Sequence, residues 1–195
     1  MAARLVVLAS GSGSNLQAII DACSAGTIDA NVVAVVVNRP SAYALVRAQQ
    51  AGIETRLIER LDGEVRGNYD ARLADTVAPF EPDWIVLGGW MRLLSMKFLD
   101  RFPSRVVNLH PALPGELPGM HAIERAWEEA QSAQRTRSGV MVHLVPDEGV
   151  DDGPVLATRE IPIDLSGTLE EFADTVHRTE HALLVDTLSE LCSPG

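Results

Sequence analysis

The sequence predicts an α/β fold, namely a doubly wound and mostly parallel β-sheet with an antiparallel edge near the C-terminus. Short runs of apolar residues alternate with stretches of helical periodicity through the first half of the chain. A turn rich in glycine and serine separates the first apolar run from the first helical stretch, as at the ligand-binding edge of doubly wound sheets. In the second half, two strand-like runs follow each other around an acidic turn, which predicts an antiparallel pair.

Strands that are buried on both faces appear as continuous apolar runs. Such runs lie at residues 4–10, 32–37, 55–58, 84–87 and 105–109, and the antiparallel pair lies at 139–145 and 155–163. Helices are expected where apolar residues recur every three to four positions. These stretches are residues 15–25, 43–51, 68–77 and 122–133, with a final helix that a capping box at 168–171 opens and that runs to about residue 191. Prolines and glycines predict an ordered but irregular loop at 110–119.

Length and composition indicate a single folded domain over residues 1–195. A chain of this length buries roughly 70% of its extended surface, and its 46% of hydrophobic residues are enough to fill a core. The formal net charge of -11 disfavours a nucleic-acid or anionic membrane partner, because both require a basic surface. Cys23 and Cys192 are too few for a disulfide framework or a zinc ribbon. Neither a membrane-spanning apolar run nor a signal-peptide pattern is present, so we expect a cytoplasmic protein.

The sequence SGSGSN at residues 10–15 forms the turn between the first strand and the first helix. Glycines allow the backbone to approach a ligand closely, and the free N–H groups at the start of a helix favour an anion such as phosphate. The turn is not a dinucleotide-binding G-x-G-x-x-G, because Leu16 takes the place of the third glycine, and it lacks the G-K-[ST] of a nucleotide triphosphate loop. The alternative is a plain turn in which Ser14 or Asn15 only caps the helix.

Asn108 and His110 lie at the end of the fifth predicted strand, two residues apart, so their side chains point to one face. An amide can stabilise an oxyanion and an imidazole can handle a proton near neutral pH, so this pair suits acyl transfer. The alternative is structural: Asn108 would satisfy buried backbone groups and His110 would pack under the proline-rich loop. A functional His110 needs a carboxylate to orient it and raise its pKa, and the acidic turn at residues 146–154 offers candidates.

Two glycines directly follow the fourth predicted strand, at 88–89, and leave room for a flat ligand beside the sheet. Met91 and Leu93 could line an apolar pocket at this point. Arg92, which stands between them, is either a specificity donor or a partner in a surface salt bridge.

Taken in order, these motifs resemble the folate-dependent formyltransferases that act on glycinamide ribonucleotide, over essentially the whole chain. The matching stretches are VVLASGSGSNLQAIIDAC at 6–23, VVNR at 36–39, AGI at 51–53, GWMRLL at 89–94, NLHPAL at 108–113, PGMH at 118–121, VHLV at 142–145, DDGPV at 151–155 and TEHALL at 179–184. Other folate formyltransferases and formyltetrahydrofolate hydrolase are similar around the catalytic motifs. The glycine-serine-asparagine loop is what distinguishes the ribonucleotide enzymes.

The resemblance implies a Rossmann-like formyltransferase domain in which residues 1–107 bind the nucleotide phosphate and residues 108–195 carry catalysis and folate binding. It implies transfer of a formyl group from the co-substrate 10-formyltetrahydrofolate to the amine of glycinamide ribonucleotide in purine biosynthesis, without a metal. The implied catalytic residues are Asn108, His110 and Asp151, which are expected to stabilise the tetrahedral intermediate of a direct attack, with His110 protonated. The implied ribonucleotide contacts are Gly13, Ser14, Asn15, His177 and Glu180. The implied folate contacts are Arg66 near the folate tail and Met91, Arg92, Leu93, Leu94, Asn108, Pro146, Asp147, Glu148, Val150 and Asp151.

The implied partners are the two substrates alone, for an enzyme that is a monomer or a homodimer. The alternatives are a formyltetrahydrofolate hydrolase and a ligand-binding relative without catalysis. His121 and His143 match the family pattern and are interpreted as packing or supporting residues. The chain departs from the pattern in the loop at 111–116, at Asp152, where glycine is usual, and at Met141, where a small polar residue is usual. Gly149 resembles an insertion in the folate loop, so these departures bear on the geometry of that loop.

Overall fold

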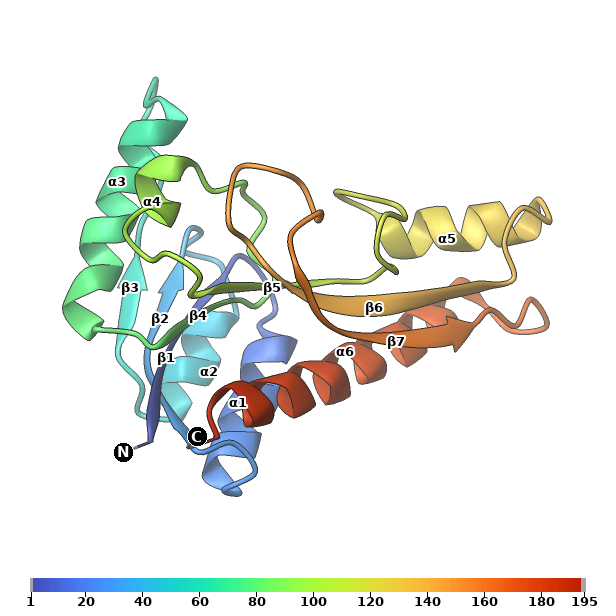
Figure 1. The fold of residues 1–195 in the computed structure, drawn as a ribbon, viewed down its shortest axis with the longest axis horizontal. Coiled ribbons are helices and arrows are strands. Elements are labelled where there is room, and N and C mark those ends of the chain that lie inside the picture. Colours follow the sequence, from blue (N-terminus) through green and yellow to red (C-terminus); the bar gives the residue numbers. More distant parts are fainter. Residues whose placement is uncertain (1, 194–195) are drawn as a thin grey trace.

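The computed structural model describes residues 2–193 of the 195-residue chain. Within these residues, seven strands form one sheet in the order β3-β2-β1-β4-β5-β6-β7 (Figure 1). The strands are β1 (Ala3–Ala9), β2 (Ala30–Val37), β3 (Thr55–Leu57), β4 (Trp84–Leu87), β5 (Val106–His110), β6 (Arg137–Leu144) and β7 (Val155–Pro162). The pairs among β1 to β5 are parallel, and β6 pairs antiparallel with both β5 and β7. The predicted fold class is therefore confirmed, including its antiparallel edge.

The strand order places β1 between β2 and β4. The chain moves outward from β1 to β3 on one side and then returns to continue through β4 and β5 on the other. In such sheets the connections after neighbouring strands separate to opposite faces, which opens a crevice at their carboxyl ends. The segments that follow β1, β4 and β5 therefore meet at one edge of the sheet.

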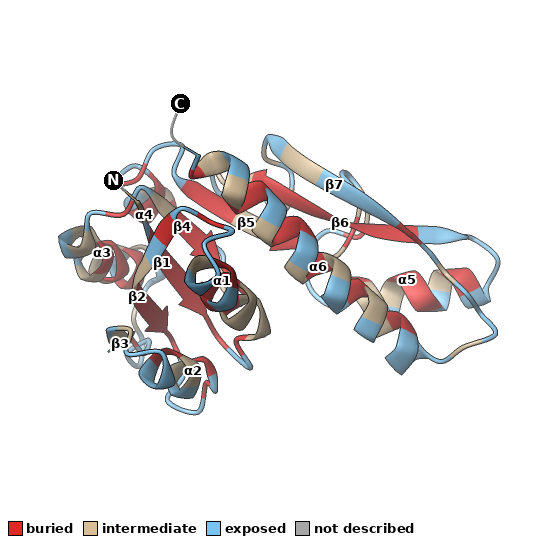
Figure 2. Ribbon diagram, turned by 90° about the horizontal axis from the view of Figure 1, so that it is seen from below, coloured by how far each residue is buried: buried red, intermediate tan, exposed pale blue. Residues whose placement is uncertain are grey.

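Helices cover both faces of the sheet (Figure 1). The helices are α1 (Ser14–Ser24), α2 (Ala44–Gln50), α3 (Arg66–Val77), α4 (Met96–Leu99), α5 (Ala122–Gln131) and α6 (Leu169–Leu191). One apolar core joins the sheet to α1, α2, α5 and α6, and a second joins the opposite face to α3 and α4. The central strands are accordingly buried on both sides, whereas β7 is largely exposed (Figure 2).

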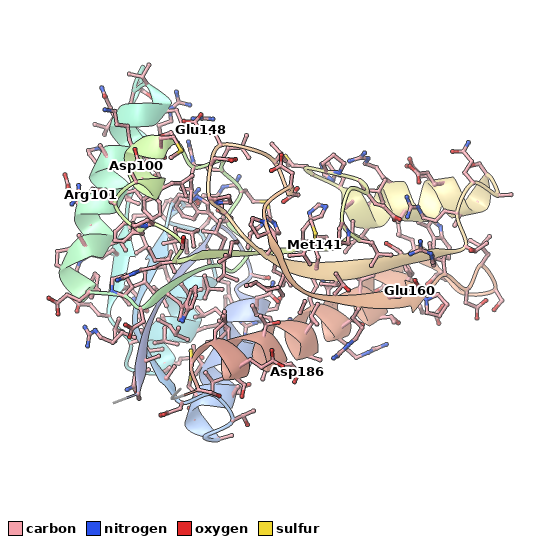
Figure 3. All side chains as sticks on the ribbon, in the orientation of Figure 1. Asp100, Arg101, Met141, Glu148, Glu160 and Asp186 are labelled. Atoms are coloured by element: carbon pink, nitrogen blue, oxygen red, sulfur yellow. The ribbon has the colours of Figure 1, made fainter. Side chains whose placement is uncertain are left out.

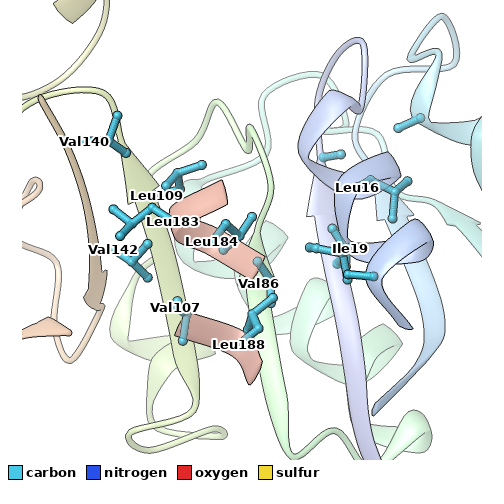
Figure 4. Close-up of a cluster of buried hydrophobic side chains, with 14 of the residues drawn as sticks. Leu16, Ile19, Val86, Val107, Leu109, Val140, Val142, Leu183, Leu184 and Leu188 are labelled. Carbon is cyan, nitrogen blue, oxygen red and sulfur yellow. The ribbon is translucent and has the colours of Figure 1, made fainter. Parts of the chain in front are cut away.

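Strand β1 shows why the buried strands are apolar without alternation. Its Leu5 and Val7 point into the first core, and Val6 and Leu8 point into the second. Because successive side chains of a strand face opposite sides, a strand between two cores needs apolar residues at every position. Figure 4 shows the first core where β5, β6 and α6 meet, with Leu184 among its labelled side chains.

The structure differs from the predicted elements mainly at their ends. Helix α3 begins at Arg66, two residues before the predicted start, because Arg66 and Gly67 add no apolar side chain to the periodicity. Helix α4 and the 3-10 turn Ala78–Phe80 were not predicted, because segments of three or four residues are too short to show a period. The capping box is present: Thr168 Oγ1 accepts a hydrogen bond from the Glu171 N–H at 3.2 Å, and the Glu171 carboxylate accepts one from the Thr168 N–H at 2.8 Å.

Within residues 2–193, no helix combines the length and the apolarity that crossing a membrane requires.

Candidate active site

The centre of the site is the end of strand β5. Asn108 and His110 project from the face opposite to Val107 and Leu109, which lie in the first core. In the antiparallel register of β5 and β6, His143 stands directly opposite Asn108 and Met141 stands opposite His110. Figure 3 labels Met141 on β6 at this position. The prediction that Asn108 and His110 share a face is confirmed by this arrangement.

Asp151, from the loop between β6 and β7, reaches the Asn108 and His110 side chains. Its Oδ2 lies 3.3 Å from Nδ1 of His110 and accepts a hydrogen bond from the Gly119 N–H at 2.8 Å. Its Oδ1 accepts a hydrogen bond from Nδ2 of Asn108 at 3.1 Å. Asp151 has a φ of 55°, a left-handed conformation that Asp adopts more readily than most residues with a side chain. The structure thus brings Asn108, His110 and Asp151, which are distant in the sequence, into direct contact.

His143 belongs to the same hydrogen-bonded group. Its Nε2 lies 3.1 Å from Nδ2 of Asn108 and 3.6 Å from Oδ1 of Asp151, and its Nδ1 lies 2.8 Å from the Leu144 carbonyl. A proton on Nδ1, donated to that carbonyl, leaves Nε2 free to accept from Asn108, so one tautomer satisfies both contacts. The Asn108 amide then donates both of its N–H groups. The interpretation of His143 as a supporting residue agrees with this contact, whose partner only the β5–β6 register reveals.

His110 is buried, and both of its ring nitrogens have partners. Nε2 lies 3.0 Å from the Leu117 carbonyl, to which it donates, while Nδ1 faces Asp151. Burial lowers the pKa of His110 below its ordinary value, and the Asp151 carboxylate and the Leu117 carbonyl oppose this effect without overcoming it. The carboxylate partner does raise the pKa of His110, as expected, but desolvation of the ring outweighs this attraction and the net shift is downward.

Asp151 remains the ionised member of the pair. Burial alone would raise its pKa, but the hydrogen bond from the Gly119 N–H, together with the nearby His143 and His110 rings, holds the pKa of Asp151 below its ordinary range. The carboxylate is thus a fixed negative charge beside His110. A weakly basic imidazole and a fixed carboxylate form a pair that can accept and return a proton near neutral pH.

The loop that supplies Leu117 and Gly119 is held from outside the site by Arg135. The Arg135 guanidinium bonds to the Glu116 carboxylate and, from Nε, to Oε2 of Glu129 at 2.8 Å. The Arg135 side chain is only 14% exposed, so this ion pair is shielded from solvent. Leu117 has a φ of 47°, and its conformation therefore depends on neighbours that hold it in place. The sequence contains no local signal for this clamp, because Glu116 and Arg135 meet only in the folded chain.

The glycine-serine turn lies at the same sheet edge. Gly13 has a φ of 71°, and a Cβ built on it would lie 2.8 Å from Cβ of Ala44, so both conformation and space require glycine. The first N–H groups of α1, which begins at Ser14, have no acceptor within the helix and point out of its start. Arg47 on α2 donates from Nε to the Ser12 carbonyl at 2.9 Å and adds a positive charge beside the turn, which sequence reasoning did not single out. The arrangement can hold an anion.

The segment after β4 is tied to this turn. Ser10 donates its N–H to the Gly89 carbonyl at 3.0 Å, and its Oγ accepts from the Met91 N–H at 2.9 Å. The Met91 and Leu93 side chains are about half exposed. The Leu94 side chain is buried in the second core, so only its backbone is available to a ligand.

Arg92 stacks on an aromatic ring. Its guanidinium lies 4.8 Å from the ring centroid of Tyr69, whose hydroxyl donates to the Ile58 carbonyl at 2.9 Å. Of the two predicted roles for Arg92, a surface salt bridge is not found among the described residues, and the stacking contact stands in its place.

The outer part of the β6–β7 loop, at residues 146–150, is exposed. Within it, Glu148 forms an ion pair with Arg66 and accepts a hydrogen bond from the Met96 N–H at 3.0 Å. The loop thus spans from Asp151 in the site to the starts of α3 and α4. Two of the predicted folate contacts, Arg66 and Glu148, therefore bond to each other.

Two further predicted residues form a pair on α6. Nδ1 of His177 lies 2.7 Å from Oε2 of Glu180, and this hydrogen bond raises the pKa of His177 although partial burial opposes it. Glu180 is buried and His177 is about half exposed. In the described part of the chain, no hydrogen bond or ion pair joins these two side chains to Asn108, His110 or Asp151.

His121 does not pack in the site, contrary to its interpretation as a packing or supporting residue. It precedes α5 with a φ of 60°, its side chain is 69% exposed, and its ion-pair partner, 4.0 Å away, is Glu124. The reason is its place at the helix start, where the left-handed backbone turns the ring outward. Among residues 2–193, no cluster of three or more His, Cys, Asp or Glu side chains has a geometry suited to a metal ion.

Comparison with known proteins identifies relatives over nearly the whole chain. The sequence profile described as Formyl transferase matches residues 3–188. The phosphoribosylglycinamide formyltransferase of Schizosaccharomyces pombe is 42% identical, and that of Dictyostelium discoideum is 40% identical; each alignment covers 98% of this chain and 98% of the relative. The crystal structure of glycinamide ribonucleotide transformylase 1 from Geobacillus kaustophilus superposes with a TM-score of 0.91 at 35% identity, covering 99% of this chain and 100% of that one.

Proposed function

The chain belongs to the formyl transferase family and is a transferase, and from this premise we propose that it moves a formyl group from 10-formyltetrahydrofolate to the amine of 5'-phosphoribosylglycinamide. The full-length relatives bear the name of that reaction, a step of purine biosynthesis. The observation that carries the proposal is the contact of Asn108, His110 and Asp151 at the sheet edge where the glycine-serine turn also lies. An amide, an imidazole and a carboxylate around one point are the groups that a formyl transfer needs.

The reaction begins when the acceptor amine attacks the formyl carbon of the folate. A bond forms between that carbon and the amine nitrogen, and the formyl oxygen gains negative charge in the tetrahedral intermediate. One N–H of the Asn108 amide stabilises this oxygen in place of one of its present partners. Loss of a single donor of this kind typically costs about 100- to 1,000-fold in rate.

His110 carries the proton. A neutral imidazole accepts the proton that the attacking amine loses, and returns it to the folate nitrogen as the bond from that nitrogen to the formyl carbon breaks. The lowered pKa of His110 supports this role, because it keeps the ring neutral and able to accept near pH 7. When the substrate takes the place of the Leu117 carbonyl at Nε2, the ring proton lies on Nδ1 facing Asp151, so Nε2 is free to accept a proton. Asp151 holds the ring in position and stabilises the imidazolium.

Each substrate is assigned contacts from both halves of the chain. Within residues 1–107, the turn at Gly13, Ser14 and Asn15 would hold the phosphate, which fixes the amine near the formyl carbon and lowers the orientational cost of the reaction. His177 and Glu180 would contact the ribonucleotide from α6. The folate would lie between the segment at 91–94 and the loop at 146–151, with Arg66 near its tail. The exposed apolar side chains of Met91, Leu93 and Val150 support a flat ligand there.

The test is an absorbance assay of folate product release, carried out with and without the ribonucleotide acceptor. The proposal predicts product only when the acceptor is present. Product without acceptor would instead identify a formyltetrahydrofolate hydrolase, and ligand binding without product would identify a non-catalytic relative. Replacement of His110 by Asn in a protein that still folds should reduce kcat by about 100- to 10,000-fold, and a rate near the wild-type value would remove His110 from the mechanism.

A further inference from the structure

The carboxylate of Glu148, three residues before Asp151 on the β6–β7 loop, lies between a guanidinium and a backbone N–H outside the catalytic group. Its Oε2 pairs with the Arg66 guanidinium, and its Oε1 accepts from the Met96 N–H at 3.0 Å. Three separate segments therefore meet at one carboxylate: the β6–β7 loop, the first residue of α3 and the first residue of α4. Figure 3 labels Glu148 above α4, near Asp100 at the end of that helix.

A surface pocket of about 400 Å³ adjoins this contact. Its lining residues are Arg66, Gly67, Ser95, Met96, Lys97, Asp100 and Glu148. Lys97 is the single lysine of the sequence. The two cations of the pocket, Arg66 and Lys97, are balanced by the two carboxylates while Glu148 is in place. When Glu148 moves away, only Asp100 balances the two cations, so the pocket has a net positive charge. The Arg66 guanidinium and the Met96 N–H then lose the acceptor that Glu148 provides.

We propose that Glu148 is an internal competitor for the substrate carboxylate that binds at Arg66, and that it thereby sets how strongly the enzyme prefers a folate with a charged glutamate tail. The inference rests on the proposed function, which places the folate tail at Arg66. A tail carboxylate offers the same charge and the same two oxygens as Glu148, so it can accept from Arg66 and from the Met96 N–H in the same way.

The contact is suited to exchange. The Arg66 and Glu148 side chains are 42% and 44% exposed, so solvent screens their attraction and the pair opens readily. Asp151, on the same loop, has a side chain that is only 11% exposed and is held by the Gly119 N–H and by Asn108. The catalytic carboxylate therefore keeps its own anchors when Glu148 leaves Arg66.

Competition predicts both the direction and the size of a substitution effect. Glu148→Gln keeps the shape and the acceptor for Met96 but removes the charge that pairs with Arg66. An exposed ion pair is closed only a few times more often than it is open, so removal of the competitor should strengthen binding of a charged tail by about two- to fivefold. A folate analogue without the tail makes no use of Arg66 and gains nothing.

The experiment measures KM for 10-formyltetrahydrofolate and for 10-formyltetrahydropteroate, which lacks the glutamate. The expected result is that Glu148→Gln lowers the KM for the tailed substrate relative to the tailless one by about two- to fivefold. Asp100→Asn is the matched control, since it removes a charge from the same pocket without freeing Arg66. In an Arg66→Met background, Glu148→Gln should no longer change the ratio.

Three outcomes would overturn the inference: an unchanged ratio, an equal effect of Asp100→Asn, or a higher KM for both substrates in Glu148→Gln. The last outcome would mean that Glu148 holds the folate site together. If the wild-type protein forms no product with either folate, the proposed function fails on its own. Calorimetric affinities for the same two folates then test the competition separately, because they require binding and no turnover.

Discussion

Replacement of Asp151 by Asn tests the arrangement at the centre of the site. The Asp151 carboxylate accepts from the Gly119 N–H on one oxygen and from the Asn108 amide on the other. An Asn side chain has one oxygen and one NH2 group, so in either orientation a donor faces a donor and one of these hydrogen bonds is lost. The substitution also removes the negative charge that lies 3.3 Å from Nδ1 of His110.

The magnitude follows from these two losses. Without the carboxylate, the imidazolium that forms during proton transfer loses its counter-charge, and the ring loses the partner that orients it. General acid–base catalysis and preorganised charge are each worth factors of about 100 or more. We expect kcat to fall by about 100- to 1,000-fold, which corresponds to about 3–4 kcal/mol in the barrier. The KM values should change little, because Asp151 acts on His110 more than on substrate.

A pH profile gives a second readout with a defined sign. Asp151 raises the pKa of His110 against the larger effect of burial, so its removal should lower that pKa further. If the neutral imidazole is the active form, the acid limb of the kcat profile must move to lower pH in Asp151→Asn. A purely structural role for Asp151 would reduce the rate without this displacement.

The assay is steady-state formyl transfer, followed by absorbance of the folate product over a range of pH. Asp152→Asn is the matched control, since it makes the same change one residue away on an exposed side chain. Thermal unfolding establishes that both variants fold. A kcat within threefold of wild type in folded Asp151→Asn, or an acid limb that moves to higher pH, would refute the reasoning.

Three further predictions concern the parts that surround this group. Gly13→Ala should lower the free energy of unfolding, measured in urea, by about 1–3 kcal/mol and raise the KM of the ribonucleotide. The reason is that the added Cβ would meet Ala44 and that the backbone at this position is left-handed. Unchanged values of both quantities would contradict this prediction. Arg135→Lys should reduce kcat by about three- to tenfold, since lysine cannot reproduce the fork that holds Glu116, and a full rate would contradict the clamp. The hydrogen bond with Glu180 is the main cause of the raised pKa of His177. The stabilisation that protonated His177 gives to the folded protein is therefore complete below the unfolded pKa of about 6.5 and is lost as the pH rises through the folded pKa. The Tm advantage of wild type over His177→Asn should shrink at alkaline pH, and an advantage that grows there would contradict this prediction.

The strands could be predicted because of where they lie. A strand such as β1, whose side chains fill a core on each face, has to be apolar at every position, and that run is visible in the sequence. Helix α4 has four residues and one buried aromatic, Phe98, so no periodicity marks it. The order of the strands depends on pairing between segments that are distant in the sequence. The alternation of apolar runs and helical stretches indicated only that the sheet is doubly wound.

The site could be predicted only in part, and for a related reason. Asn108 and His110 share one strand, so their common face follows from the spacing alone. The contact with Asp151 depends on a loop whose path no local pattern describes, and its assignment came from the resemblance. The position of His143 opposite Asn108 depends on the β5–β6 register, which a strand prediction does not fix. The Leu117 carbonyl, a backbone group, leaves no trace in the residue types at all.

These contacts share one physical cause, and it bears on how substrates bind. A buried polar group without a partner is costly, so the protein supplies internal partners to the groups that the substrates would use. For this reason His110 bonds to the Leu117 carbonyl, and the Asn108 amide bonds to His143 and Asp151. The exposed Arg66 guanidinium also has an internal partner, Glu148, which it attracts by charge.

Substrate binding is then an exchange of partners, and the affinity reflects the difference between the new contact and the old one rather than the full strength of the new one. The exchange at His110 takes place in a buried site and involves backbone, so no side-chain replacement can remove the competing carbonyl. The exchange at Arg66 is exposed and involves a side chain. Removal of the Glu148 carboxylate should therefore strengthen substrate binding, because it removes an internal partner of Arg66. Removal of the Asp151 carboxylate should instead slow the reaction, because Asp151 acts on His110 during proton transfer.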